Sequence, residues 1–339
     1  MPEHPPANGE SLIVTLAGAL FLAIALGAFT AGWPVTASVL GTPTASPTAT
    51  FTATATRIPT ATFTATPSPT ITPTPTPTAT ATAIPKQPPI TLPGHFWLAR
   101  PISPEFNNWV AHFYPYGSTA EGQYPIHHGV EFVNDTGTPI QAVAPGQVIV
   151  AGPDSDQVYG PQTAFYGLLV VVQLDQEYRG QPVYTLFGHL SELLVRPGDL
   201  VSPGQIIGRV GMTGVALGPH LHFEVRVGQN TYAHTRNPEL WLQARPGNGT
   251  LLARVLDRAG QPVVEAFATV QLTDADKVFR TATTYPAQEI SPDEEWNENL
   301  VMGDLPAGEW KLAVRVGERT LVRTLEIVPG QLTFVTLQR

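Results

Sequence analysis

The sequence contains no cysteine and has few charged residues. Its 339 residues include only 3 Met, and 13% are Asp, Glu, Lys or Arg. Without thiols the chain can form neither disulfides nor thiolate metal sites, and it has no cysteine nucleophile. The net charge is −9 and no basic block is present. Because phosphate neutralisation needs clustered Lys and Arg, we expect no nucleic-acid partner.

One long apolar run lies near the N-terminus. Eighteen consecutive uncharged, mostly apolar residues extend from Leu12 to Phe29, enough for a helix that crosses a bilayer. Glu3 and Glu10, and no Lys or Arg, precede this run, so the positive region of a signal peptide is missing. A small-residue cleavage site near position 36 keeps the second possibility open. We expect residues 1–35 to be a membrane anchor or a cleaved signal.

A segment rich in Thr and Pro follows. Residues 42–82 contain 18 Thr and 8 Pro in 41 positions. Such a segment cannot bury enough apolar surface to offset its ordering entropy, and each Pro removes a donor that a β-ladder needs. The composition therefore predicts an extended linker over residues 36–94.

The rest of the chain has a β pattern. Short β-type runs separated by Gly and Pro turns recur through residues 95–245. Residues 246–339 alternate more cleanly, as in 305–316, where Trp310 and Leu312 share a face. This predicts a mainly β fold, with an antiparallel sheet of hairpins in the first unit (95–245) and a small β-sandwich in the second unit (246–339).

Five of the nine histidines lie in three short motifs. The motifs are HHGVE (127–131), FGHL (187–190) and GPHLHFE (218–224). On a strand, His220 and His222 point to the same face. Two neutral imidazoles and a carboxylate are the ligand set of catalytic zinc, which keeps its fourth position for water.

The first motif can contribute to one site only if the chain bends. His127 and Glu131 would lie about 13 Å apart on a straight strand, too far to share an ion. Gly129 between them permits a bend that closes this gap, with His128 pointing away. Glu224 shares the face of His222, and we interpret it as an ion-pair or supporting residue rather than a ligand.

Residues 120–240 resemble the lysostaphin/LytM-type zinc metalloendopeptidases, which cleave peptide cross-links of bacterial cell walls. The resemblance rests on the three motifs and is most specific over 201–225, and it covers no other part of the chain. More loosely, residues 257–263 and 305–310 of the second unit resemble carboxypeptidase-regulatory-like and prealbumin-like β-sandwiches.

The family resemblance implies a role for each motif residue. It makes His127, Glu131 and His222 the ligands of one Zn²⁺, and His189 and His220 the non-ligand catalytic pair. One of the pair would accept a proton from the metal-bound water and the other would stabilise the oxyanion, and the sequence does not assign which. The family has Asp where this chain has Glu131, whose additional methylene moves the carboxylate by more than about 1 Å.

The predicted function is a zinc-dependent endopeptidase that hydrolyses peptide cross-links of bacterial peptidoglycan, acting on stem peptides or cross-bridges. The anchor and linker predict a cell-envelope protein with an extracytoplasmic folded part, or a secreted one if the anchor is cleaved. Two alternatives stay open. The chain could be a non-catalytic regulator of another wall hydrolase, or a glycan-binding surface protein whose second unit carries the function, although that unit shows no aromatic platform.

Some residues outside the motifs have two interpretations at this point. The aromatic residues at 109, 113, 114 and 116 either line a substrate groove or belong to ordinary packing. The histidines at 4, 95, 112 and 234 are interpreted as surface or hydrogen-bonded core residues.

Overall fold

The computed structural model describes residues 91–92 and 95–339. The predicted membrane segment (1–35) and most of the predicted linker lie outside the described residues. Within the described part, no helix is both long and apolar enough to span a bilayer. Strand β1 (Thr91–Leu92) falls inside the predicted linker, yet it pairs antiparallel with β17 (Leu332–Gln338).

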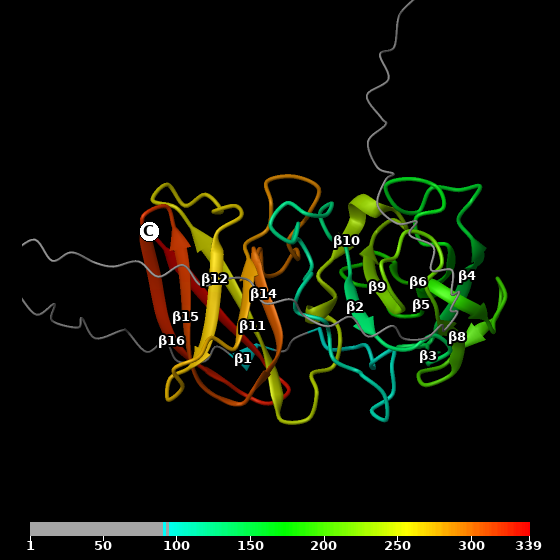
Figure 1. Ribbon diagram of the computed structural model, residues 1–339, viewed down its shortest axis with the longest axis horizontal. Coiled ribbons are helices and arrows are strands. Elements are labelled where there is room, and N and C mark those ends of the chain that lie inside the picture. Colours follow the sequence, from blue (N-terminus) through cyan, green and yellow to red (C-terminus); the bar gives the residue numbers. More distant parts are fainter. Residues whose placement is uncertain (1–90, 93–94) are drawn as a thin grey trace, which may run out of the picture. The chain divides into compact units, whose positions relative to one another are not determined.

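The first unit is built on one nine-stranded sheet (Figure 1). Every strand pairing in it is antiparallel, as the sequence predicts. The strands are β2 (Val130–Val133), β3 (Pro139–Gln141), β4 (Gly146–Pro153), β5 (Leu168–Leu174), β6 (Val183–Leu193), β7 (Leu200–Val201), β8 (Ile206–Val210), β9 (His220–Val227) and β10 (Thr235–Arg236). The main path through the sheet is β10–β9–β6–β5–β4–β7, and β2 pairs with β9.

Strand β9 is buried on both faces, and the two faces differ in chemistry. Leu221, Phe223 and Val225 point into the main hydrophobic core. The alternate residues of the same strand are polar, and from His222 onward they are also buried. A buried polar face needs internal partners, because unpaired polar groups are costly away from water. The sheet therefore presents a buried row of titratable side chains along β9.

The second unit contains two four-stranded sheets, in the orders β1–β17–β11–β14 and β13–β12–β15–β16. Its strands are β11 (Asn248–Leu256), β12 (Phe267–Leu272), β13 (Arg280–Thr283), β14 (Leu300–Pro306), β15 (Gly308–Val316) and β16 (Arg319–Ile327), with β17 closing the chain. Side chains from both sheets form one buried apolar cluster, centred on residues such as Trp310 and Leu251. The resemblance of the second unit to carboxypeptidase-regulatory-like or prealbumin-like sandwiches stays a prediction.

One pairing in the second unit differs from an all-antiparallel arrangement. Strands β11 and β17 run parallel, with Thr250 opposite Leu332. A parallel pair needs a long connection, and these are the first and last strands of the unit, with all its other elements between them. The alternation of residues within a strand does not indicate which distant strand it pairs with. The sequence pattern therefore could not predict this parallel pair.

The two units share a core and several buried polar contacts. The main hydrophobic core includes Trp241 from the first unit and Trp296 from the second. Two short 3₁₀ helices, η1 (Tyr232–His234) and η2 (Pro238–Leu240), precede the junction. Glu239 of η2 forms a buried ion pair with Arg280. Buried apolar and charged residues therefore hold the second unit against the first.

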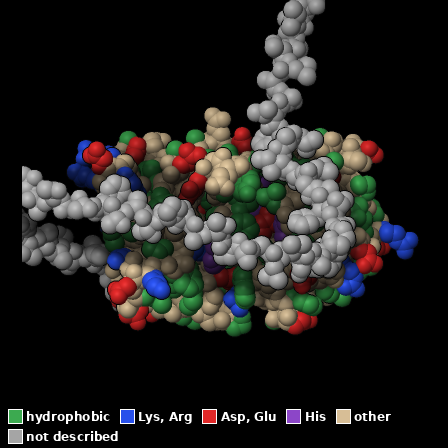
Figure 2. All heavy atoms as spheres, in the orientation of Figure 1, with side chains coloured by type: hydrophobic (Ala, Val, Ile, Leu, Met, Phe, Trp, Pro, Cys, Tyr) green, Lys and Arg blue, Asp and Glu red, His purple; other side chains and the backbone are tan. Residues whose placement is uncertain are grey.

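Charges are mixed over the molecular surface. On the face drawn in Figure 2, acidic and basic side chains are interspersed among hydrophobic ones. This distribution agrees with the low charge content of the sequence.

Candidate metal centre

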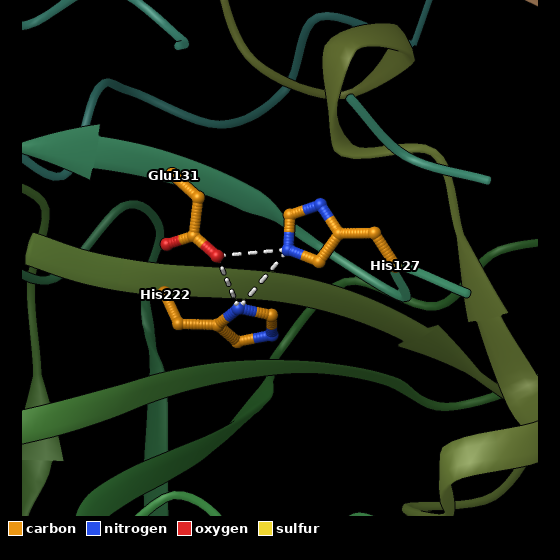
Figure 3. A group of neighbouring side chains, drawn as sticks. All are labelled: His127, Glu131 and His222. Carbon is orange, nitrogen blue, oxygen red and sulfur yellow. Dashed lines mark hydrogen bonds and ion pairs between the residues drawn. The ribbon is translucent and has the colours of Figure 1, made fainter. Parts of the chain in front are cut away.

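Three side chains converge on one point between β2 and β9 (Figure 3). His127 Nε2 lies 2.9 Å from Glu131 Oε1 and 3.3 Å from His222 Nδ1. His222 Nδ1 lies 3.1 Å from the same carboxylate oxygen. All three residues are buried. The sequence motifs thus bring two imidazoles and one carboxylate together at a single place.

Strand register positions two of these side chains. Glu131 on β2 is directly opposite His222 on β9. His127 precedes the first residue of β2, so the straight-strand separation does not apply, and the predicted bend is present. A Cβ at Gly129 would lie 2.7 Å from the His222 ring and 2.6 Å from the Phe223 carbonyl oxygen. Gly129 is therefore needed for the close approach of this ring.

His127 is oriented by its backbone and aromatic surroundings. Its Nδ1 lies 2.7 Å from the Tyr114 carbonyl oxygen, to which the ring N–H must donate. The Tyr114 ring stacks on the His127 imidazole at 4.1 Å. With Nδ1–H committed to the carbonyl, the Nε2 lone pair faces the other two members of the group.

His222 is oriented the opposite way by a buried carboxylate. Its Nε2–H donates to Glu224 Oε1 at 3.0 Å, which leaves Nδ1 to face the group. Arg226 Nε donates to the other oxygen of Glu224 at 2.7 Å, and the Tyr166 hydroxyl also donates to Glu224. Burial alone would raise the pKa of Glu224, but the charges and hydrogen bonds of Arg226 and His222 together outweigh it and lower the pKa to about 2. Glu224 therefore stays ionised and holds the ring.

The group has a clear charge preference in the metal-free protein. Burial is the largest single effect and opposes charge on both partners, but the attraction between Glu131 and His222, together with hydrogen bonds from His127, His220 and His222, outweighs it and holds the pKa of the Glu131 carboxyl well below its usual value. The same attraction, with help from Glu224, raises the pKa of His222 to about 9. A proton on His222 thus compensates the buried carboxylate, and a bound cation would do the same.

The donor atoms fit a tetrahedral cation of zinc's size. Zinc–nitrogen and zinc–oxygen bonds of about 2.0–2.1 Å place the atoms of a tetrahedral site roughly 3.3–3.4 Å apart. The three separations in this group, 2.9, 3.1 and 3.3 Å, need only a small expansion to reach that value. Nitrogen and oxygen donors with supporting hydrogen bonds on both imidazoles also match the chemistry of such sites.

The two remaining motif histidines lie beside this group. The rings of His189 and His220 are 4.8 Å apart, and the His189 ring is 5.8 Å from that of His222. His189 Nδ1 donates to the Thr213 carbonyl at 2.8 Å, and His220 Nδ1 donates to that of Gly218 at 2.8 Å. In both rings Nε2 is therefore free of these backbone contacts.

His189 is held in an unusual backbone conformation and in its neutral form. It follows Gly188 on β6 and has φ of +64°, in the left-handed region that non-glycine residues rarely adopt. Burial, and then the neighbouring His222 and His220, lower the pKa of His189 to about 4. Strained residues of this kind gather at functional sites.

The His220 Nε2 atom lies 2.9 Å from Glu131 Oε2, so the additional reach of a Glu brings this oxygen to His220.

Sequence reasoning missed the partners that orient the site. Arg226 and Tyr166 support Glu224, and the Tyr114 carbonyl supports His127. Arg226 continues the alternation of His222 and Glu224 along β9, a signal that was available in the sequence. The Tyr114 and Tyr166 contacts come from distant segments and have no local pattern.

The other interpreted residues divide clearly. His128 points away from the group and stacks on Tyr232, with Nδ1 in hydrogen-bond contact with Thr235 Oγ1. His95 is buried and bonded to Asp293, as expected of a core histidine. Tyr116 packs in the main core.

Comparison with known proteins finds similarity over the part of the chain that contains this site. Residues 125–234 match the family model described as Peptidase family M23. Lysostaphin of Staphylococcus staphylolyticus is 33% identical over 129 residues, covering 36% of this chain and 24% of its own length. The peptidoglycan DD-endopeptidase ShyB of Vibrio cholerae is 34% identical over 106 residues, covering 31% of this chain and 22% of its own length. The chain spans about a quarter of the length of the curated relatives it matches.

Solved structures also match part of the chain. The catalytic domain of lysostaphin from Staphylococcus simulans is 31% identical, covers 38% of this chain and 86% of that domain, and has a TM-score of 0.31. A zinc-containing peptidase from Vibrio cholerae is 28% identical, covers 39% of this chain and 36% of its own, and has a TM-score of 0.31.

Proposed function

We propose, from the premise that residues 125–234 form a domain of peptidase family M23, that this chain is a zinc-dependent endopeptidase acting on peptide cross-links of bacterial peptidoglycan. The observation that carries the proposal is the convergence of His127, Glu131 and His222, with ligand atoms all within 4.8 Å of one another. In the proposal these three residues hold one Zn²⁺. The family is zinc-dependent, and two of its relatives are named as peptidoglycan DD-endopeptidases of Vibrio cholerae.

A zinc ion bound here would supply an acidic water and polarise the scissile carbonyl. The chain's own contribution is to present the donor atoms. His127 offers Nε2 and His222 offers Nδ1, because a carbonyl and a carboxylate occupy their other ring nitrogens. His222 must lose a proton before its Nδ1 can bind a cation, so binding at neutral pH releases a proton.

His189 and His220 provide the proton transfer in this proposal. Each ring donates from Nδ1 to a backbone carbonyl; this leaves Nε2 of His189 free of backbone contacts, whereas Nε2 of His220 lies 2.9 Å from Glu131 Oε2. A neutral Nε2 can accept the proton of the attacking water, and a protonated one can donate to the oxyanion or to the leaving amine.

A non-catalytic regulator is the competing proposal, and no specific contact favours it. A regulator has no need for the pair of imidazoles, yet both lie beside the three donor atoms.

The proposed location is the cell envelope, with the folded part outside the membrane, anchored by residues 1–35 or released if these are removed. The proposed substrates are stem peptides or cross-bridges.

The test is digestion of purified peptidoglycan by the full chain, followed as newly released amino groups. Wild-type protein should cleave, and His220→Ala should lose at least about a hundredfold in rate, because general acid–base catalysis contributes roughly that much. At saturating zinc that variant should still hold one equivalent, since His220 is not one of the three proposed ligands, although its Nε2 contacts Glu131 Oε2.

Two results would contradict the proposal. Wild-type protein might release no amino groups while His220→Ala still stimulates a second wall hydrolase, which would establish the regulator. His234→Ala is the matched control, because this histidine is half-buried and its Nδ1 is in hydrogen-bond contact with Thr231 Oγ1, away from the three converging residues. A similar loss of rate in His234→Ala would show that the assay reports general damage.

A further inference from the structure

The second unit reaches the three donor residues indirectly, through the segment at 108–118, which lies ahead of β2 in the chain. This segment holds the His127 side chain, because the Tyr114 carbonyl accepts from His127 Nδ1 at 2.7 Å and the Tyr114 ring stacks on the imidazole at 4.1 Å. It also holds the His127 backbone, whose carbonyl accepts from the Gly117 N–H at 2.8 Å and whose N–H donates to the Ser118 carbonyl at 2.9 Å. The position of the His127 ring therefore depends on the position of this segment.

A tight turn at the end of the segment lets a side chain of the second unit come close. The Ser118 N–H donates to the Pro115 carbonyl at 3.0 Å, and Gly117, the third residue of this turn, has φ of +77°. Glycine adopts that conformation without strain. A Cβ at Gly117 would also lie 2.9 Å from the Tyr285 ring, so no space is left between the backbone of the turn and that ring.

Tyr285 is fixed by contacts from both units. It is buried in the main core, where its ring packs edge-on against the Tyr116 ring at 5.6 Å. Its hydroxyl donates to Glu298 Oε1 in the second unit at 3.1 Å and accepts from Asn237 Nδ2 in the first unit at 3.1 Å. Its backbone N–H donates to the Asn299 carbonyl at 2.8 Å. The Tyr285 ring is therefore a fixed surface against which the turn packs.

The other end of the segment is also linked to the second unit. Arg100 Nη1 donates to the Asn108 carbonyl at 2.6 Å, and Nη2 of the same guanidinium donates to Asp304 Oδ1 at 2.5 Å. Between the two ends, the Ala111 N–H donates to the carbonyl of Glu131 at 2.9 Å. The segment thus contacts the backbones of two of the three donor residues, and it is linked to the second unit at both ends.

We propose that Tyr285 is a positioning residue for the metal site, and that the second unit thereby forms part of this site. The inference rests on the proposed function, in which His127 binds zinc. The Tyr285 ring fills the space beside Gly117, and a packed interior transmits displacements because it has few voids. Without the ring, the turn can move into the vacated space, and the groups that orient His127 move with it. Because ligands must be held to within about 0.5 Å, such a shift weakens metal binding.

The ring and the hydroxyl of Tyr285 have different roles, which two substitutions separate. Tyr285→Phe keeps the ring beside Gly117 and removes the hydroxyl contacts to Asn237 and Glu298. It should lower the stability of the protein and leave its zinc affinity unchanged. Tyr285→Leu removes the ring and should weaken zinc binding by about tenfold or more, as the loss of a supporting contact does. A residue that only stabilises the core would not show this division.

The experiment is zinc titration of the metal-free full chain in competition with a chromophoric chelator at pH 7, with urea unfolding of each variant. Leu312→Ala is the matched control, because Leu312 is fully buried in the second unit but belongs to the separate apolar cluster between its two sheets. This control should lose stability and keep wild-type zinc affinity. Gly117→Ala should weaken zinc binding as Tyr285→Leu does, since the added Cβ displaces the turn from the Tyr285 ring.

A second measurement needs no metal. Amide hydrogen exchange of the metal-free full chain follows the Gly117 N–H, which donates to the His127 carbonyl. We expect faster exchange at Gly117 in Tyr285→Leu than in Leu312→Ala, because only the first substitution loosens the turn locally.

Several results would overturn the inference. Wild-type zinc affinity in Tyr285→Leu or in Gly117→Ala would contradict it, and so would equal losses of affinity in Tyr285→Leu and Leu312→Ala, or in Tyr285→Leu and Tyr285→Phe. If Tyr285→Leu does not fold, Gly117→Ala decides. Zinc binding and peptidoglycan cleavage by the wild type, with unchanged zinc affinity in these variants, would refute this inference alone. Absence of zinc from the wild type would refute the proposed function, and the positioning role with it.

Discussion

Replacing Arg280 by Ala should strongly destabilise the protein, because Arg280 neutralises a carboxylate buried between the two units. Arg280 Nη1 and Nη2 donate to the two oxygens of Glu239 at 2.9 and 2.8 Å, and both side chains are buried. Burial alone would raise the pKa of Glu239, but Arg280, with smaller contributions from His112 and the Gly303 N–H, outweighs it and lowers that pKa. Removing one partner of such a pair leaves an uncompensated charge, so we expect a loss of about 3–5 kcal/mol in the free energy of unfolding.

Urea unfolding of the full chain, followed by tryptophan fluorescence at pH 7, measures this loss. The double variant Glu239→Gln/Arg280→Met should lose much less, because it removes both charges and keeps an acceptor for the Gly303 N–H, which now donates to Glu239 at 2.8 Å. The loss in Arg280→Ala should also shrink towards pH 4, where Glu239 can be protonated. A loss below about 1 kcal/mol in Arg280→Ala, or equal losses in the single and double variants, would refute the reasoning.

Three further predictions concern buried groups. Glu224→Gln should weaken metal binding by roughly 10–100-fold in a chelator competition, because Glu224 orients His222; unchanged affinity would contradict this support. Gly129→Ala should displace the His222 ring and reduce metal binding. Gly152→Ala is the control and should leave metal binding unchanged, because a Cβ there meets nothing within 4 Å. Equal effects of the two substitutions would be evidence against the close approach of the His222 ring to Gly129. Burial and then a neighbouring carboxylate raise the pKa of Glu298 from 4.5 to about 8, so the folded protein holds a proton that the unfolded chain releases. The free energy of unfolding of the wild type should therefore fall by up to about 1.4 kcal/mol per pH unit between pH 4.5 and about 8. Glu298→Gln lacks this titration, so its free energy of unfolding relative to wild type should rise from pH 5 to 8; a difference that stays constant with pH would refute the raised pKa.

The sequence contained most of what is needed to find the donor residues. Alternation over GPHLHFEVRV predicted one strand with His220 and His222 on the same face, and β9 spans the run HLHFEVRV. The motif HHGVE predicted that a bend brings His127 to Glu131, and their side-chain atoms are 2.9 Å apart. Local residue patterns sufficed here because neighbours in sequence, paired across two adjacent strands, form the group.

Features that depend on distant packing could not be predicted. The positive φ of His189, the orientation of His127 by the Tyr114 carbonyl, and the parallel pairing of β11 with β17 all depend on segments far apart in sequence. The same holds for the contact between the two units, where Arg280 meets Glu239. Single charged residues such as Arg280 look like solvent-exposed side chains until the partner surface is known.

The central claim is that His127, Glu131 and His222 together hold one zinc ion. Its most direct test is the zinc content of the purified full chain, compared with Glu131→Ala and His189→Ala. The account predicts one zinc per chain in the wild type and in His189→Ala, and none in Glu131→Ala. Absence of zinc from the wild type, or retention of a full equivalent in Glu131→Ala, would contradict it.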